Sequence, residues 1–397
     1  MHKYHEQLVS IKDFAIHNWP GLGFAFVVLF PSTAIVQKYF GGLGLLAYIL
    51  FGSVAVFALH HSCRTAQIPR LPTRWMAGIS IALLVALIVI FQVGYPVANS
   101  GRFGPGSDRD EALNIATGRL LHGQHPYGAP TYLNNPITPM PGSLVLAIPF
   151  YLIGNAAYQN IVWLMLLIHQ VSRYLRHNGL ALITFTTILL GSPIILQEYV
   201  TGGDLLANSI FVTITAAWLI FSVRDNDHDY MPSLLSAALF GIALSSRPNF
   251  LLLLPLLISA LYRMTTRRRA TLHVAMVFAS ASIVTFPIWA MNPEGFTPFH
   301  VLHKFDNLNS VLPYVQLWIP LSSTIFAVTI AFRRDNSAIN NLLRNCTFVL
   351  AFPVIVGTLL YSIASGQPMF GIAGIGLSFM FFGLLAFAPL RTARRVD

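Results

Sequence analysis

The acidic side chains that could act as a catalytic base are concentrated in one polar stretch, residues 106–142. A carboxylate positioned beside a hydroxyl takes its proton and makes the oxygen a better nucleophile. Asp108, Asp110 and Glu111 precede residues with helical spacing, which are Ala112, Ile115, Ala116, Arg119 and Leu120. Asp110 then lies in the first helical turn, where free backbone amides stabilise an ionised carboxylate. We expect Asp110 to be the base, with Asp108 as its competitor and Glu111 as its acidic neighbour, although a helix start also favours acids without any chemistry.

Three charged residues elsewhere in the chain are candidates for substrate contacts. Arg247 precedes Pro248, which favours extended backbone and a break between two apolar runs. Its guanidinium offers a fork that matches phosphate oxygens, and the alternative is an arginine that extends to lipid headgroups. Glu198 and Asp204 flank Gly202 and Gly203. They either order a site or belong to a solvated turn.

Polar residues in two expected loops could also contact a sugar or a phosphate. His122, His125 and Tyr127 follow the expected helix, and His303 and Lys304 lie in a second polar stretch, residues 291–310, together with Glu294, His300 and Asp306. Two histidines three positions apart without a third ligand are more typical of a solvated loop than of a metal site. No group of residues has a recognisable metal-ligand spacing. We expect no metal ligand and no cofactor, and the sequence leaves dependence on a divalent metal open.

The composition places these residues in a membrane protein. The 397 residues are 55% hydrophobic and only 10% charged, with a mean hydropathy of +0.64. Soluble domains carry about 25% charged residues. Long apolar runs without strict alternation form helices, because a helix satisfies its own backbone hydrogen bonds in lipid. The net charge of +10 arises from Arg and Lys in short loops, a pattern that orients helices and does not indicate nucleic-acid binding.

The apolar runs predict an all-α membrane bundle of about 12 transmembrane helices in one domain, residues 1–397. Its first two helices, Gly21–Gln37 and Gly41–Leu59, form a tight pair. If the basic loops are cytoplasmic, both termini are cytoplasmic and residues 95–142 and 291–310 form outer loops, the first with a helix along the membrane surface. The run 143–154 is too short for a comfortable crossing and is expected to be interfacial or re-entrant.

Two segments resemble a known family. In the first, the acids and the expected helix lead into LLHGQHPY and then PITPMPG, and the second reads GIALSSRPNFLLLLPLLISAL. Together they look like the first outer loop and a later helical hairpin of GT-C fold glycosyltransferases. More narrowly, they are similar to the bacterial mannosyltransferase-like group that uses polyprenyl-phosphate sugars. The family usually has one helix ahead of the catalytic loop, whereas three are expected here.

The resemblance implies an inverting glycosyltransferase on the outer face of a bacterial inner or plasma membrane. It would move a sugar from a polyprenyl-phosphate carrier to a hydroxyl of a glycan or lipid acceptor. By position Asp110 matches the catalytic carboxylate of the family, and Arg247 is the first candidate for the leaving phosphate. The alternatives are a transporter or flippase of lipid-linked sugar, and a polysaccharide polymerase or ligase.

Overall fold

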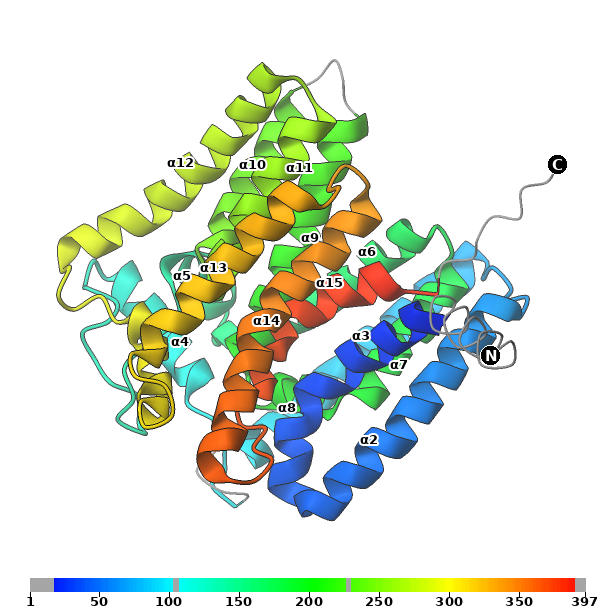
Figure 1. Cartoon of the computed structure of the whole chain (residues 1–397), viewed down its shortest axis with the longest axis horizontal. Helices are drawn as coiled ribbons and strands as arrows, with labels where there is room; N and C mark the ends of the chain where they lie inside the picture. Colours follow the sequence, from blue (N-terminus) through cyan, green and yellow to red (C-terminus); the bar gives the residue numbers. More distant parts are fainter. Residues whose placement is uncertain (1–17, 103–106, 226–229, 390–397) are drawn as a thin grey trace, which may run out of the picture.

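The computed structural model describes residues 18–102, 107–225 and 230–389, and within these ranges it contains helices and no strand (Figure 1). The predicted all-α class is confirmed. The first half of the chain forms η1 (Phe30–Ser32), α2 (Thr33–Thr65), α3 (Thr73–Ala98), α4 (Arg109–Leu121), α5 (Pro141–Leu152), η2 (Ala156–Tyr158), α6 (Gln159–Leu175), α7 (Asn178–Gly191), α8 (Pro193–Val200) and α9 (Asp204–Asp225). The second half forms α10 (Met231–Leu244), η3 (Pro248–Leu253), α11 (Leu254–Met264), α12 (Arg267–Met291), η4 (Pro298–Leu308), α13 (Val315–Arg333), α14 (Ile339–Ser365), η5 (Ala373–Gly376) and α15 (Leu377–Phe387).

Several long apolar helices make this chain a multi-pass membrane protein. Among the described residues, six helices are long and apolar enough to cross a membrane, or up to eight if each of two bent helix pairs is one span. The predicted count of about 12 is therefore not confirmed. Three apolar segments, α10, η3–α11 and η5–α15, are shorter than the roughly 20 residues that a crossing needs. One of the two bent pairs consists of α7 and α8, with an angle of 77° between them.

The first candidate span, Asn18–Thr65, is the predicted helical pair. Its helical geometry is interrupted at Gly41, where φ is +66°. Glycine takes this left-handed conformation without a Cβ clash, and the chain reverses its direction between the two limbs (Figure 1).

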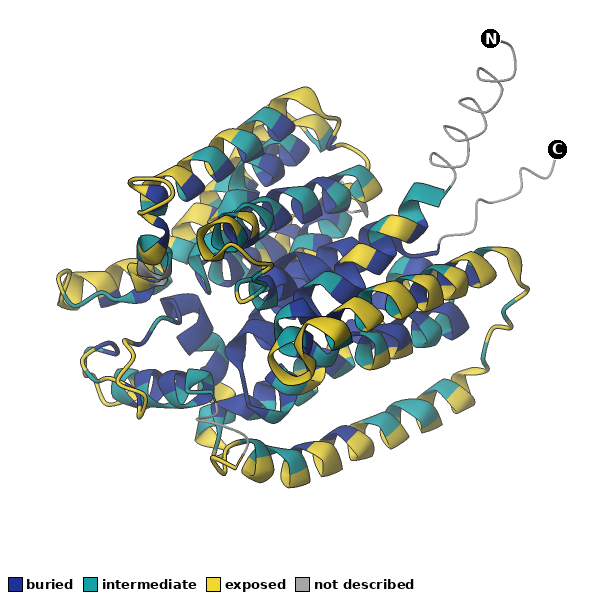
Figure 2. Cartoon of the chain, turned by 60° about the horizontal axis from the view of Figure 1, so that its bottom comes forward, coloured by how far each residue is buried: buried dark blue, intermediate teal, exposed yellow. Residues whose placement is uncertain are grey.

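Burial divides the helices into an inner and an outer group. In α9, 78% of the apolar window is buried, and every residue of α15 is buried. The corresponding figure is 11% for Asn18–Thr65, for α3 and for α12, which therefore carry long exposed apolar surfaces (Figure 2). Exposed apolar helices of this length are stable where lipid is the solvent.

Two breaks predicted from sequence are present. Arg247, between α10 and η3, has φ −152° and ψ 143°, which is the extended conformation that Pro248 favours. Helix α5 is a separate element bent by 100° from the η2–α6 segment. The bend agrees with the expectation that residues 143–154 do not form one straight span with the following run.

Loops with basic residues meet in pairs. The side-chain amide of Asn178 donates to the carbonyl of Leu71 (2.6 Å) and accepts from its N–H (3.0 Å), and His177 contacts the carbonyl of Ile68 (3.1 Å). Nη1 of Arg263, near the end of α11, lies 3.9 Å from Oδ1 of Asp335 in the loop after α13. The loops after α2 and α6 therefore lie at the same end of the bundle, as do those after α11 and α13.

Candidate functional site

The first turn of α4 presents charged residues in several directions. Asp108, Arg109, Asp110 and Glu111 are consecutive, and Asp108 is the residue at which the helix begins. Because successive residues of a helix are rotated by about 100°, neighbours on this turn contact different parts of the molecule. Buried apolar residues on the other turns, among them Leu113, pack against α5 and hold the helix in place.

Asp108 lies against the loop that joins α4 to α5. Its Oδ2 accepts hydrogen bonds from the Thr131 hydroxyl (2.6 Å) and from the Asn135 amide (2.8 Å). Glu111, on another side of the turn, accepts from the backbone N–H of Tyr132 (2.7 Å) in the same loop. Both carboxylates thus order this loop, and Asp108 also lines the large cavity described below.

Asp110 faces the interior of the bundle. Its Oδ2 accepts a hydrogen bond from the hydroxyl of Tyr95 in α3 (2.5 Å). The hydroxyl oxygen of Tyr95 accepts in turn from the Asn155 amide (3.0 Å). Asp110 is only 7% exposed, and burial raises the pKa of its carboxyl while the hydrogen bond from Tyr95 opposes that shift. It lines neither of the two cavities beside this turn. The residue expected to be the base therefore connects α4 to α3.

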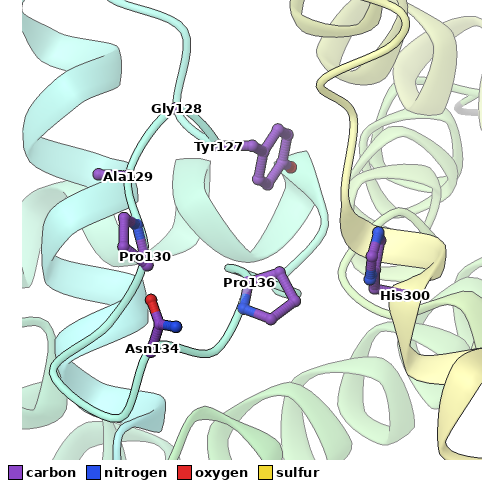
Figure 3. A pocket seen from close by; sticks show the side chains of 7 residues that line it. All are labelled: Tyr127, Gly128, Ala129, Pro130, Asn134, Pro136 and His300. Atoms are coloured by element: carbon purple, nitrogen blue, oxygen red, sulfur yellow. The ribbon is translucent and has the colours of Figure 1, made fainter.

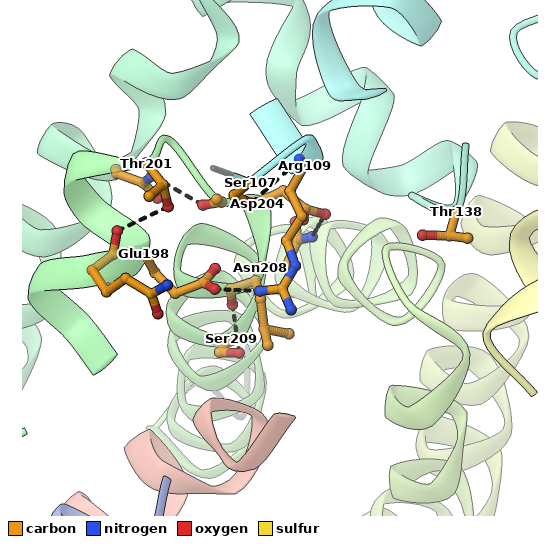
Figure 4. Close-up of polar contacts among 12 residues, drawn as sticks. Ser107, Arg109, Thr138, Glu198, Thr201, Asp204, Asn208 and Ser209 are labelled. Atoms are coloured by element: carbon orange, nitrogen blue, oxygen red, sulfur yellow. Dashed lines mark hydrogen bonds and ion pairs between the residues drawn. The ribbon is translucent and has the colours of Figure 1, made fainter. Parts of the chain in front are cut away.

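Two ion pairs connect the turn between α8 and α9 to arginines. Arg109 pairs with Glu198, which is largely buried, and this carboxylate is the main reason that the pKa of Arg109 is raised (Figure 4). Arg247 binds Asp204 through two nitrogens, with Nε 3.1 Å from Oδ2 and Nη2 on Oδ1. Asp204 is fully buried and also accepts from Asn208 (2.9 Å). The burial of Glu198 and Asp204 contradicts the interpretation of a solvated turn, and Arg247 has a carboxylate of the protein as its partner.

Glycine is required in this turn. Gly202 has φ +72°, and a Cβ there would lie 2.8 Å from Ala157 Cβ and 2.9 Å from Asp110 Cβ. A Cβ at Gly203 would lie 2.1 Å from an oxygen of Glu198. The two glycines therefore let the acidic turn approach α4 closely enough for Glu198 to reach Arg109.

A cavity of about 870 Å³, here called the large cavity, combines polar and apolar walls. Its polar residues include Asp108, Arg109, Thr131, Asn135, Thr138 and Arg247. The apolar wall comes from η3, α11, α13, α14 and η5, with Leu251, Leu254, Ile319, Ala327, Leu350 and Ile375 among its residues. Along α13 the lining extends from Ile319 to Ala327, which is about 12 Å at the helical rise. The large cavity thus joins a charged region to an apolar channel between apolar helices.

Figure 3 shows the residues around a second cavity of about 420 Å³, here called the small cavity. Its walls are Tyr127, Gly128, Ala129, Pro130, Asn134, Pro136 and His300. Pro136 and His300 also line the large cavity. The two cavities therefore share part of their walls.

The remaining predicted residues lie in different surroundings. His122 ends α4, with Nδ1 2.7 Å from the carbonyl of Gly118, and it lines neither cavity. His125 has both ring nitrogens buried without a hydrogen-bond partner among the described residues, and burial lowers the pKa of its imidazole. The buried Tyr127 donates its hydroxyl to the carbonyl of Pro139 (3.0 Å). His303 and Lys304 belong to η4, but their side chains lie outside the described part of the structure.

Sequence reasoning missed several residues of this region. Arg109 lies between two of the proposed acids. A cation at that position could have been recognised from the sequence as a candidate for binding an anion. Tyr95, Thr131 and Asn135 gave no such signal, because they become partners of the acids only through folding. Within the described ranges, no three His, Cys, Asp or Glu residues are grouped so that they could hold a metal ion.

The fold and the site together define a class: a multi-pass helical membrane protein with a charged cavity that continues between apolar helices. Comparison with protein-family models, with curated proteins and with solved structures found no match.

Proposed function

We propose that this protein is a glycosyltransferase that moves a sugar from a polyprenyl-phosphate carrier to an acceptor hydroxyl. The observation that carries the proposal is the large cavity, where one carboxylate and two guanidiniums adjoin an apolar channel. A lipid-linked phosphate has the same two parts, an anionic group and a hydrocarbon chain. Arg109 and Arg247 are paired with Glu198 and Asp204, and their remaining N–H groups suit the phosphate because a guanidinium binds its oxygens with directed, charge-assisted hydrogen bonds.

Asp108 is the proposed base. It is the carboxylate of this helical turn that lines the large cavity, and hydrogen bonds from Thr131 and Asn135 hold it in one orientation. Asp110, the first choice from sequence, is bound to Tyr95 and lines neither cavity. Asp110 and Glu111 then act as positioning residues that fix α4 and the loop opposite it.

The proposed reaction is a single displacement at the anomeric carbon. Asp108 takes the proton of the acceptor hydroxyl while its oxygen forms the new glycosidic bond. The bond between the anomeric carbon and the phosphate oxygen breaks, and the carrier phosphate leaves with the electron pair. Arg109 and Arg247 stabilise the charge that develops on the leaving oxygen. Inversion follows because the acceptor attacks from the side opposite the phosphate.

The resemblance of the acidic loop and of the Arg247 hairpin to the GT-C group supports the same assignment. It implies an active site on the outer face of a bacterial inner or plasma membrane, with both termini cytoplasmic and a glycan or lipid as acceptor. These points remain part of the proposal, as does the assignment to the mannosyltransferase-like group.

The test is transfer of labelled sugar from a polyprenyl-phosphate sugar pool to acceptors in membranes that contain matched amounts of each variant. Asp108→Asn is expected to lower transfer by about 10²–10⁴-fold, the usual contribution of a general base. Asp110→Asn, whose amide oxygen still accepts from Tyr95, is expected to keep transfer within about tenfold of wild type. The reverse ranking would return the base to Asp110.

A transporter or flippase would give a different result. Labelled lipid-linked sugar would cross the bilayer of vesicles that contain the purified protein, and no labelled product would form in any pool. That outcome would reject the transferase proposal.

A further inference from the structure

We propose that the small cavity binds the acceptor, and that this acceptor is the uncharged, hydroxyl-bearing end of a glycan. The inference depends on the transferase function proposed above and names the acceptor class for the same site. It starts from the loop between α4 and α5, which forms walls of both cavities.

One segment of this loop separates the two cavities. Asn134 lines the small cavity, whereas Thr131 and Asn135 line the large one and hold Asp108. Pro136 and His300 line both (Figure 3). The proposed base is thus bound to the segment that divides them, and a ligand in the small cavity that extends past Pro136 meets the region of Asp108.

The charge of the two cavities differs. The large cavity contains the side chains of Asp108, Arg109 and Arg247. The described residues that line the small cavity include no Asp, Glu, Lys or Arg. An anionic donor can hydrogen-bond to the guanidiniums of the large cavity, whereas the described lining of the small cavity offers no Arg or Lys to an anion. The guanidinium of Arg119 lies beside Gly128 but is not part of that lining.

The walls of the small cavity match a sugar. Pro130 and Pro136, both exposed, supply apolar surfaces for the C–H faces of a sugar ring, and the Asn134 amide can both donate to and accept from hydroxyls. Asn134 has φ +59°, and its N–H donates to the carbonyl of Thr131 (2.8 Å), so the turn that presents the amide is hydrogen-bonded to the segment that holds Asp108. The volume of about 420 Å³ is within the range of small-molecule sites, about 300–1,000 Å³.

The binding test uses the full-length protein in lipid nanodiscs and saturation-transfer NMR. The probes are methyl glycosides of glucose, galactose, mannose and N-acetylglucosamine, with glucose 6-phosphate as the charged comparison. At least one neutral glycoside is expected to bind, more strongly than glucose 6-phosphate, and to remain bound when polyprenyl phosphate is added. Absence of glycoside binding, or displacement of the glycoside by polyprenyl phosphate, would overturn the inference.

Two variants locate the binding. Asn134→Gly keeps the left-handed backbone and removes the amide, so glycoside affinity is expected to fall about fivefold, the usual effect of one hydrogen bond. Ala129→Phe fills the small cavity and is expected to abolish the signal. Asn340→Ala removes an exposed amide from α14, outside both cavities, and is expected to leave it unchanged. Binding that survives both cavity variants would overturn the assignment to this cavity.

The transfer assay separates this inference from the proposed function. Sugar transfer without glycoside binding in the small cavity rejects the acceptor site and leaves the transferase intact. Glycoside binding in that cavity without transfer from any lipid-linked donor rejects the transferase, and with it the description of the bound sugar as an acceptor.

Discussion

At the scale of single residues, the position of a carboxylate on the first turn of α4 decides whether it lines the large cavity or is buried against another helix. Asp108 and Asp110 are two residues apart, so their side chains differ in direction by about 200°. One lines the large cavity, and the other is enclosed against Tyr95. The two carboxylates therefore experience different surroundings although the sequence around them is shared.

The enclosed position of Asp110 predicts a pH dependence of stability. Because burial raises the pKa of its carboxyl in the folded protein, the folded state keeps a proton that the unfolded state has lost once the pH exceeds the ordinary value of about 3.9. The free energy of unfolding therefore decreases as the pH rises from that value past the raised pKa. Thermal unfolding of wild type and Asp110→Asn across this range should show the decrease in wild type and a smaller one in the variant. Parallel curves would contradict the prediction.

The two ion pairs should differ in their contribution to stability. Asp204 is fully buried and the Arg247 side chain is 13% exposed, so Asp204→Asn leaves a poorly solvated cation. The expected loss is about 3–5 kcal/mol of unfolding free energy. Glu198→Gln should cost less, because the Arg109 side chain is 36% exposed and water can solvate its charge. Unfolding of both variants in detergent tests which substitution costs more unfolding free energy. An equal loss would show that the exposure of the arginine does not determine the cost of losing its partner.

At the scale of elements, the turn between α8 and α9 brings α4 and the α10–η3 break together. It supplies Glu198 to Arg109 and Asp204 to Arg247. Its close approach to α4 depends on the absence of a side chain at Gly202.

Gly202→Ala should therefore be strongly destabilising. The new Cβ would meet Ala157, Asp110 and Tyr95 at 3.0 Å or less, in addition to the strain of a left-handed backbone. Gly101→Ala is the matched control, since Gly101 has φ +77° with no atom within 4 Å of the added Cβ. The control should lose only the conformational term of about 1–2 kcal/mol, and Gly202→Ala clearly more, as measured by thermal unfolding. Equal losses of stability would mean that the turn between α8 and α9 accommodates the added Cβ of Gly202→Ala, which would contradict the prediction.

At the scale of the whole molecule, the apolar channel of the large cavity links the charged site to the apolar helix bundle. Helices α11, α13 and α14 form its walls, and long apolar helices elsewhere expose their surfaces to lipid. Under the proposed function, this arrangement would keep a polyprenyl chain in an apolar environment while its phosphate contacts the arginines.

Filling this channel should raise the KM for the proposed polyprenyl-phosphate sugar donor. Ala327 of α13 is fully buried and lines the channel, so Ala327→Trp is expected to raise the KM for the polyprenyl-phosphate sugar about tenfold, equivalent to about 1.4 kcal/mol. At 25 cal/mol per Å² this corresponds to roughly 55 Å² of lost apolar contact. Val328→Trp is the control, because the neighbouring Val328 is 37% exposed and does not line the channel. An unchanged KM in Ala327→Trp would remove the lipid chain from this channel.

The sequence by itself determined the class of the protein and several local features. Apolar runs must be helical in lipid because the backbone has no water with which to form hydrogen bonds. The helix after Asp108 and the break at Arg247 also follow from local rules, since helical spacing and proline act over a few residues. The candidate acids and Arg247 could be recognised as possible site residues for the same reason.

Only the tertiary structure decided how these residues are combined. Arg109 pairs with a carboxylate 89 residues away, and Arg247 with one 43 residues away. Such contacts depend on how helices bend and pack, and the close approach of the acidic turn to α4 at Gly202 is one result of that packing. Whether Asp108 or Asp110 faces the large cavity depends on the rotation of α4, which its packing against α5 determines.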